Sequence, residues 1–331
     1  MTRSTAMARG RQSLSRFSEY SWAGLLLIIL LLVVIMSVVS DSFLSDFNIF
    51  VVLRSVATAV LIGSAQMAVL SIGQMNLSVG AIGGLAAITA GGIMDAYGLP
   101  VWLAIIGGLA CGAAAGALNG IIVARTGLNA FIVTIATASV FLGLNLGLTS
   151  AQPFYDLDPN FTSFGQARFG FFPVMGFITV ATMIALAVFY YRTLVGRQLL
   201  AVGGNLSAAQ TAGIPVGRRV VWAHILSGLL AGGAGMLWAS QLGAAQPMIG
   251  QSWLLVSFAV PIIGGVALTG GSVRIIGLFL AALIIALINN MLVHLGIDPV
   301  YVELLLGLLI LGTVWASHVA TRSEETKRSL R

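Results

Sequence analysis

Six polar side chains stand inside long apolar stretches of the 331-residue chain, and their chemistry gives the first clue to a function. Five are amides and one is a hydroxyl: Gln66, Asn76, Ser78, Asn145, Asn289 and Asn290. Amides and hydroxyls donate and accept hydrogen bonds without carrying charge. These side chains could therefore line a path along which a hydroxylated solute binds weakly. The alternative is packing, because polar contacts between helices in lipid contribute only about 0.6 kcal/mol each.

Residues that usually carry catalysis or energy conversion are scarce. The histidines His224, His294 and His318 are isolated, and no H-x-x-x-H or H-E-x-x-H pattern occurs. The single lysine, Lys327, lies in a polar tail, whereas a Walker A loop needs a lysine after its glycines to hold phosphates. The single cysteine, Cys111, lies in an apolar run and is interpreted as a packing residue. We therefore expect no enzyme activity, no catalytic residue, no cofactor and no metal site in this chain.

The composition indicates that the solvent of this chain is largely lipid. Hydrophobic residues make up 58% and charged residues only 8%, whereas a soluble domain carries about 25% charged residues. The 40 glycines agree, because small residues let helices approach closely in a membrane. The formal net charge of +6 resides in short segments between apolar runs, so it is better explained by membrane topology than by a nucleic-acid partner.

Ten apolar runs approach the length of about 20 residues that a helix needs to cross a bilayer. They lie at 21–40, 50–71, 79–94, 100–123, 129–149, 171–191, 219–240, 252–268, 275–294 and 300–318. The third and eighth runs are short and contain glycines, so we expect broken or partly re-entrant helices there. The predicted fold class is all-α: a polytopic membrane helix bundle of about ten transmembrane helices.

The positions of arginine and lysine predict the orientation of the chain. If the N-terminus is cytoplasmic, most basic residues fall inside, as the positive-inside rule requires. They are Arg3, Arg9, Arg11, Arg16, Arg125, Arg192, Arg197, Arg218, Arg219, Arg274, Arg322, Lys327, Arg328 and Arg331. Only Arg54 and Arg168 lie on or near the outer side. The expected organisation is a cytoplasmic basic tail (1–20), a transmembrane domain (21–318) with a long inner loop (192–219), and a cytoplasmic polar tail (319–331).

The apolar runs contain almost no ionisable residues that could couple transport to an ion gradient. Arg54 and Glu303 lie near the ends of their runs and are interpreted as interfacial side chains. Proton-coupled and sodium-coupled carriers usually place ionisable residues inside their spans. Ion coupling is therefore disfavoured, although backbone carbonyls could still hold an ion, and an energy source in a partner protein is expected.

Several glycine-rich segments follow one another in an order that resembles a known family. Segment 73–80 reads G-Q-M-N-L-S-V-G and resembles the G-x-D-L-S-V-G segment of the ribose/xylose/arabinose-type permeases of bacterial ABC importers. The inner loop is similar to that family's G-R…A-x-G-G-N-x-x-A-A…S-G-I signature at Gly196-Arg197, Gly203-Gly204-Asn205, Ala208-Ala209 and Gly213-Ile214. Matching segments continue at Ala245-Gln246-Pro247, Leu268-Thr269-Gly270-Gly271, Ile276-Gly277, Asn289-Asn290 and Leu295-Gly296. The resemblance runs from the second span to the ninth.

The resemblance implies a binding-protein-dependent sugar importer in the bacterial inner membrane. Its expected partners are cytoplasmic ATP-binding subunits, a periplasmic solute-binding protein, a second permease subunit (identical or not) and a sugar-like solute. The residues expected to couple to the ATPase are Asn205, Ala208, Ala209, Ala212 and Gly213, although an ordinary ordered loop is the alternative. Asn205 is expected to cap a short helix there. A stand-alone secondary carrier or channel is the alternative function.

Two departures from the family pattern concern acidic residues. Asn76 stands where the family has an aspartate, and the segment around Leu254 and Val256 carries no acid where the family shows one. These losses leave the solute open. They also leave open whether the permease pairs with an identical or a non-identical subunit.

Overall fold

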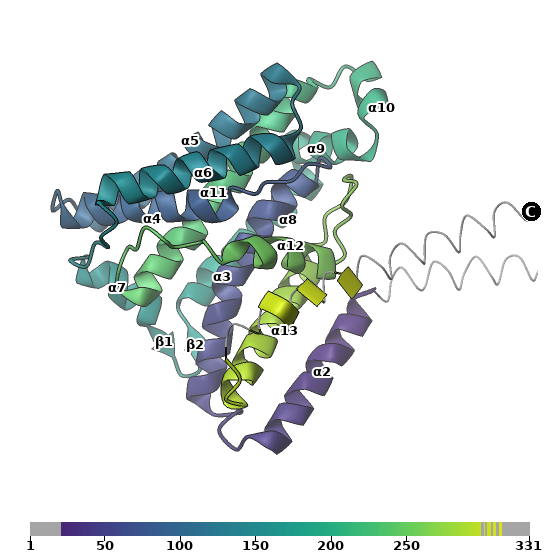
Figure 1. Ribbon diagram of the computed structural model, residues 1–331. Coiled ribbons are helices and arrows are strands. Elements are labelled where there is room, and N and C mark those ends of the chain that lie inside the picture. The colour runs from purple at the N-terminus through teal and green to yellow at the C-terminus, as the bar shows by residue number, and fades with distance from the viewer. Residues whose placement is uncertain (1–20, 299–300, 302, 306, 309–310, 313–331) are drawn as a thin grey trace, which may run out of the picture.

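The structure is a computed structural model that describes residues 21–298, 301, 303–305, 307–308 and 311–312. Regular structure in these residues is almost entirely helical (Figure 1). The helices are α2 (Ser21–Val39), α3 (Asp46–Leu70), α4 (Val79–Asp95), α5 (Val101–Thr126), α6 (Ala130–Thr149), α7 (Pro159–Gln166), α8 (Met175–Arg192), α9 (Leu194–Gly204), α10 (Leu206–Thr211), α11 (Val216–Leu242), α12 (Trp253–Ile263) and α13 (Ile275–His294). The strands β1 (Arg168–Phe169) and β2 (Phe172–Pro173) form an antiparallel hairpin.

Seven of the described helices are long and apolar enough to cross a membrane: α2, α3, α5, α6, α8, α11 and α13. Each arises from one of the apolar runs, because a helix satisfies its backbone hydrogen bonds within itself, as the bilayer core requires. Large apolar side chains point outward from these helices, with Leu27 67% and Val38 83% exposed. Lipid is the solvent that suits such a surface. These findings confirm an all-α polytopic membrane protein.

The third and eighth apolar runs form short helices, α4 with 17 residues and α12 with 11. Helix α12 is shorter than the eighth apolar run, because the helix ends at Ile263 whereas the run continues to residue 268. Pro261 lies inside its last turn and lacks an N–H, and Gly264 and Gly265 follow directly. Gly265 has a φ of +81°. This left-handed conformation commonly follows the end of a helix, and glycine adopts it most readily. The tenth run, 300–318, lies mostly outside the described residues.

Both long loops contain structure that the apolar pattern did not reveal. Segment 150–170 contains α7 and β1, and the segment after α8 contains two helices, α9 and α10. The side chain of Asn205 accepts a hydrogen bond from the amide of Ala208 at 2.9 Å, which confirms the predicted N-cap of α10. The side chain of Thr193 caps α9 in the same way, accepting from Gly196. Capping residues thus start helices that, with 11 and 6 residues, are too short to span a membrane.

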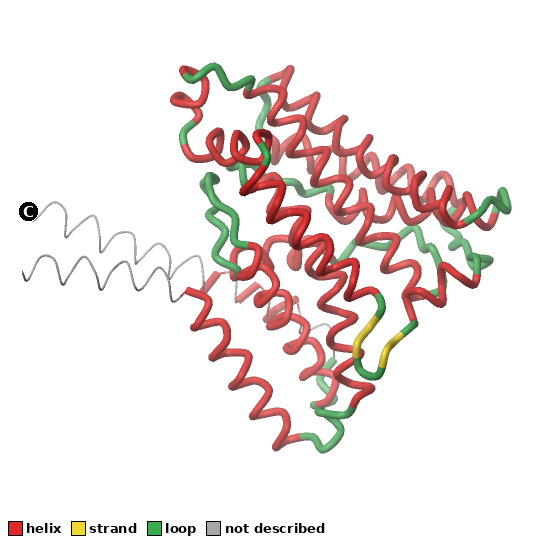
Figure 2. The backbone as a smooth tube through the Cα atoms, turned by 180° about the vertical axis from the view of Figure 1, so that it is seen from behind, coloured by secondary structure: helices red, strands yellow, loops and turns green. Residues whose placement is uncertain are grey.

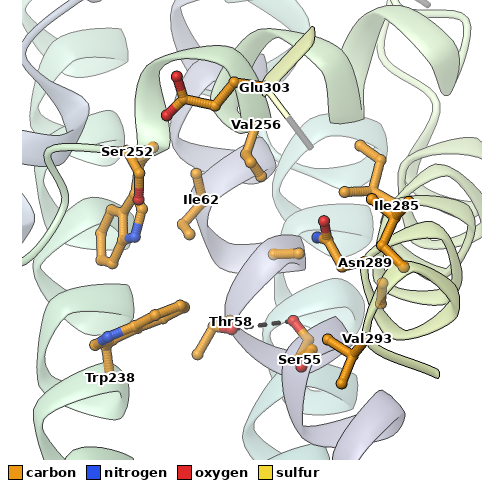
Figure 3. Close-up of a pocket in the computed structure, with 14 residues that line it drawn as sticks. Ser55, Thr58, Ile62, Trp238, Ser252, Val256, Ile285, Asn289, Val293 and Glu303 are labelled. Atoms are coloured by element: carbon orange, nitrogen blue, oxygen red, sulfur yellow. Dashed lines mark hydrogen bonds between the residues drawn. The ribbon is translucent and has the colours of Figure 1, made fainter. Parts of the chain in front are cut away.

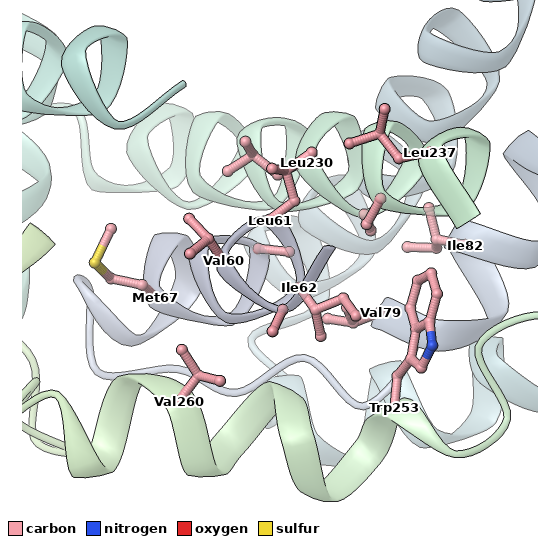
Figure 4. Close-up of a cluster of buried hydrophobic side chains, with 14 of the residues drawn as sticks. Val60, Leu61, Ile62, Met67, Val79, Ile82, Leu230, Leu237, Trp253 and Val260 are labelled. Atoms are coloured by element: carbon pink, nitrogen blue, oxygen red, sulfur yellow. The ribbon is translucent and has the colours of Figure 1, made fainter. Parts of the chain in front are cut away.

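Close packing between helices depends on glycine. Along the contact of α5 with α11, a Cβ on Gly112 would lie 2.6 Å from the carbonyl oxygen of Gly228, so only glycine permits this approach. Figure 4 shows α3 between α11, which carries Leu230 and Leu237, and α12, which carries Val260. On α3, a Cβ on Gly63 would overlap Val260, so α12 lies directly on the backbone of α3.

The charged residues gather at two opposite ends of the molecule. We call one the arginine end, where Gln198 of α9 accepts a hydrogen bond from Arg219 at 2.7 Å. It holds Arg125, Arg192, Arg197, Arg218, Arg219 and Arg274. We call the other the aspartate end, where Asp95 accepts from the amide of Asp156 at 3.0 Å. It holds Asp41, Asp46, Asp95, Asp156 and Asp158. Figures 1 and 2 show α9 and α10 far from the β hairpin, which lies at the aspartate end.

Candidate functional site

A cavity of about 430 Å³ lies between α3, α11, α12 and α13, and we call it the main pocket. It occupies the half of these helices nearer the aspartate end, because it is lined by early residues of α3 and late residues of α11 and α13. Figure 3 shows its walls. The lining residues are Ser55, Thr58, Ala59, Ile62, Trp238, Ser252, Trp253, Val256, Ile285, Ala286, Asn289, Leu292, Val293 and Glu303.

Aromatic rings and a few polar groups share this pocket. The rings of Trp238 and Trp253 meet edge to face, with centroids 5.8 Å apart. Asn289 from α13 and Glu303 supply an amide and a carboxylate, which Figure 3 shows on different walls. Serine hydroxyls add further donors and acceptors. An apolar cavity with a few converging polar groups is typical of a small-molecule site, and aromatic faces beside hydroxyl-binding groups suit a sugar.

Two adjacent amides of α13 have different surroundings. Asn289 lines the main pocket, whereas the amide of Asn290 pairs reciprocally with that of Asn48 on α3. One bond of this pair, from Asn48 Nδ2 to Asn290 Oδ1, measures 3.0 Å, and the reverse bond measures 2.7 Å. Asn290 therefore joins two helices. Of the six amide and hydroxyl residues expected on a transport path, Asn289 is the one that lines this cavity.

Asn76 and Ser78 belong to a buried hydrogen-bond network at the break between α3 and α4, which we call the break network. Asn76 Nδ2 donates to the hydroxyl of Ser227 on α11 at 2.9 Å. Asn76 Oδ1 accepts from the amide of Ser78 at 2.9 Å and from its hydroxyl at 2.6 Å. The amide of Asn119 on α5 donates to the same hydroxyl at 2.8 Å. All four side chains have 0% exposure, so the network fixes the non-helical break inside the bundle.

Gln66 and Asn145 are buried amides with unused hydrogen-bonding atoms. Within the described part of the chain, Gln66 has 0% exposure and neither of its amide atoms has a partner. Asn145 donates to the carbonyl oxygen of Ala81 at 3.3 Å, but its Oδ1 is likewise unpartnered there. An unsatisfied buried polar group costs about 1–3 kcal/mol, so we expect a water molecule or a solute to bind these amide atoms.

Gln66 lies directly beyond the main pocket along α3. Ser55, Ala59 and Ile62 line the pocket at helical spacing, and Gln66 continues the same stripe by one turn. At that depth α12 closes against α3, where Val260 occupies the space over Gly63. Figure 4 shows Val260 on α12 beneath α3. We call the contact of Gly63 with Val260 the α3–α12 seal.

The residues expected to couple to an ATPase lie at the arginine end. Asn205 caps α10, Ala208 and Ala209 lie within it, and Ala212 and Gly213 end it, with Gly213 at a φ of +75°. Ala209 is buried, whereas Leu206 is 51% exposed at the start of the helix. The arrangement presents a short capped helix with an exposed apolar side chain.

Comparison with known proteins assigns this architecture to a family. The family described as "Branched-chain amino acid transport system / permease component" matches residues 48–314. The chain is 38% identical over 290 residues to the ribose import permease protein of Bacillus subtilis (strain 168), covering 87% of this chain and 88% of that protein. It is 34% identical over 298 residues to the D-allose transport system permease protein of Escherichia coli (strain K12), covering 90% and 91%.

A fructose import permease protein of Rhizobium meliloti is 33% identical over 323 residues, with 93% of this chain and 90% of that protein covered. No solved structure matches the chain. These relatives are transport permeases and not enzymes. The chain therefore belongs to the family of sugar import permeases that its glycine and amide motifs resemble, and it is a multi-pass permease of the bacterial inner membrane.

Proposed function

We propose that this chain is the membrane-spanning permease subunit of an ABC importer that moves a monosaccharide or similar small polyhydroxylated solute into the cytoplasm. The observation that carries the proposal is its similarity, over most of its length, to permeases named for ribose, allose, fructose and L-arabinose. The main pocket supports it, because two tryptophan rings, an amide and hydroxyls offer the groups that bind sugars.

In this proposal the arginine end faces the cytoplasm, and so do the tails 1–20 and 319–331. The positive-inside rule supports this orientation, because Arg54 and Arg168 are the only arginines near the aspartate end among the residues that the structure describes. Both of these arginines lie over aromatic rings, with Arg54 5.2 Å and Arg168 5.6 Å from the ring centroid of Phe50. The main pocket then occupies the outer half of the membrane.

A solute would enter the main pocket from the periplasm and meet Trp238, Trp253 and Asn289 first. To continue inward it must pass the α3–α12 seal and then reach Gln66, whose amide has both a donor and an acceptor to offer. Asn76, Ser78, Asn145 and Asn290 contribute to this path through the helices that they hold in place. A permease fed by a binding protein does not need a tight site of its own.

Energy is supplied by partner proteins. Separate ATP-binding subunits would dock on α10 through the coupling loop 192–219, where Leu206 is exposed. A periplasmic binding protein would deliver the solute at the aspartate end. A second permease subunit, identical or not, completes the membrane part. The absence of a lysine-containing phosphate loop supports a separate ATPase.

Uptake of labelled sugars into proteoliposomes tests the proposal. The chain is reconstituted with and without an ATP-binding subunit and a binding protein from the same genome, whose ligand is first found by thermal-shift screening. We expect uptake only with both partners and ATP. Uptake that persists without the ATP-binding subunit and collapses with the ion gradient would instead identify a stand-alone secondary carrier.

A further inference from the structure

Three segments that are far apart in the sequence meet at the arginine end, backbone against backbone. They are the segment directly after α3 (71–73), the end of α9 (203–204) and the loop after α12 (269–271). The amide of Gly271 donates a hydrogen bond to the carbonyl oxygen of Ser71 at 3.0 Å. We call this contact the glycine junction; its members are Ser71, Gly73, Gly203, Gly270 and Gly271.

No side chain separates the three backbones. A Cβ on Gly203 would overlap the carbonyl oxygen of Ser71 and lie 2.5 Å from the amide nitrogen of Gly271. A Cβ on Gly270 would lie 2.5 Å from the amide nitrogen of Gly73. A Cβ on Gly271 would lie 2.7 Å from the Cα of Gly204. Glycine is therefore required here for close approach, which explains why glycine pairs recur in segments that the sequence separates widely.

Each segment leads directly to a part of the transport machinery. Gly204 precedes Asn205, the cap of α10. The loop that contains Gly271 follows α12, whose Val260 forms the α3–α12 seal. Ser71 and the residues after it form the break that ends in the break network. The glycine junction thus joins α10 to the break between α3 and α4 and to the loop that follows α12.

A backbone contact transmits movement better than a contact between long side chains. Atoms at van der Waals distance cannot approach further, because a protein interior is close-packed. The hydrogen bond from Gly271 to Ser71 resists separation of the same segments. Long side chains would absorb a displacement by changing rotamer, whereas a glycine backbone has no rotamer to change. Small shifts at such contacts become movements of whole elements.

We propose that Gly203 and Gly271 are positioning residues for transport. Displacement of α9 and α10 by the nucleotide-bound ATPase passes through the glycine junction to the loop after α12 and draws Val260 away from Gly63. The proposal rests on the proposed function, since it needs an ATPase that acts on α10. It adds the route by which that action reaches the α3–α12 seal.

Two neighbouring glycines provide a matched test in the reconstituted importer. A Cβ on Gly204 would meet its nearest atom, the Cα of Gly271, only at 3.9 Å, whereas a Cβ on Gly203 overlaps Ser71. Neither residue has a positive φ, so both backbone conformations are ones that alanine adopts, and the two substitutions differ in the contacts of the new methyl group. We expect Gly203→Ala to assemble with the ATPase and hydrolyse ATP, but to carry roughly tenfold less solute per ATP, because overpacking forces the segments apart. Gly204→Ala should match the wild type. Equal coupling in the two variants would overturn the proposal.

Hydrogen exchange of the unmodified complex gives a second measurement, which decides the question if Gly203→Ala does not assemble. On binding of a non-hydrolysable ATP analogue, we expect peptides covering 199–206 and 266–273 to change protection together. A change confined to the first peptide would refute transmission through the junction. A failure of the proposed function looks different, because the wild-type chain would then show no ATP-dependent uptake at all.

Discussion

At the residue scale, neighbouring side chains of one type carry out different tasks. Asn289 and Asn290 follow each other on α13, and successive helical residues point about 100° apart. One consequently reaches the main pocket while the other pairs with Asn48. The sequence offers the pair, but the rotation of the helix about its axis decides which amide meets the solute.

This difference predicts that one alanine substitution impairs uptake and the other lowers stability. Asn289→Ala should lower the maximal rate of uptake roughly fivefold to tenfold, which corresponds to the loss of about one hydrogen bond to the solute during passage, without changing the melting temperature. Asn290→Ala should leave the maximal rate of uptake unchanged but lower stability by about 1 kcal/mol, because Asn48 Oδ1 loses its donor while Asn48 Nδ2 keeps its bond to the carbonyl oxygen of Phe43. Uptake kinetics and thermal unfolding in detergent measure the two effects. Wild-type uptake by Asn289→Ala would show that Asn289 does not contact the solute.

Asn76 illustrates how a network accommodates the loss of a family carboxylate. Its Oδ1 already accepts two hydrogen bonds from Ser78, which an aspartate would also accept. Its Nδ2 donates to Ser227, and the hydroxyl of Ser227 can rotate and donate instead.

We therefore expect Asn76→Asp to keep most of the transport activity, while Asn76→Ala loses stability by about 1–3 kcal/mol because buried partners are left unsatisfied. The control is Asn76→Asp combined with Ser227→Ala, which removes the donor that the carboxylate needs and should fold less well than either single variant. Thermal unfolding and uptake measure the series. If Asn76→Asp is as damaging as Asn76→Ala, the hydrogen-bond roles assigned to Ser227 are incorrect.

At the element scale, α12 is a short helix of 11 residues that packs along α3 and includes a tight contact between Val260 and Gly63. Pro261 and the glycines after it end the helix before it is long enough to cross the membrane. The contact of Val260 with Gly63 lies between Ile62, which lines the main pocket, and Gln66 along α3.

A double-mutant cycle tests the α3–α12 seal. Gly63→Ala should destabilise the protein by about 1–3 kcal/mol through overlap with Val260. Val260→Ala should cost a comparable amount by leaving a void, and should allow slow solute leakage without ATP. The double variant should cost less than the sum, because the new methyl group fills the space that the valine vacates. Gly143→Ala on α6, with nothing within 4 Å of its Cβ, serves as the control. Additive costs would show that these residues do not contact each other.

Elements differ in how far the sequence predicts them. The apolar runs predicted most membrane helices, because lipid requires an uninterrupted apolar helix wherever the chain crosses. Helix α9 was missed, because its three glycines have low helix propensity and its stability comes from the Thr193 cap and packing on neighbouring helices. The main pocket was not predicted either, because it also depends on how the helices pack. Trp238 and Trp253 are separated in sequence and meet only after α11 and α12 pack.

Folding also revealed what the glycine motifs do. In the sequence, Gly203-Gly204 and Gly270-Gly271 are two separate family signatures, and no spacing rule connects them. The structure brings both against Ser71. Pairing of this kind depends on tertiary contacts between loops, which hydrophobic periodicity does not encode.

At the scale of the whole molecule, the separation of charge between the two ends predicts how the protein sits in the membrane. The arginine end carries α9 and α10, and the aspartate end carries the hairpin and is the end nearer the main pocket. If the arginine end is cytoplasmic, the pocket opens toward a periplasmic binding protein and α10 toward an ATPase. The opposite orientation would reverse the direction of transport.

Single-cysteine labelling decides between these orientations. In a Cys111→Ala background, Tyr97→Cys probes the exposed turn between α4 and α5 at the aspartate end, and Gln210→Cys probes α10 at the arginine end. Both positions are exposed, so a membrane-impermeant maleimide should reach either one if its side of the membrane is accessible. Because the positive-inside rule places the arginine end in the cytoplasm, residue 97 should react in intact spheroplasts and residue 210 only after permeabilisation. The reverse pattern would place α10 outside, where no ATPase could act on it, and would remove the basis for coupling through the glycine junction.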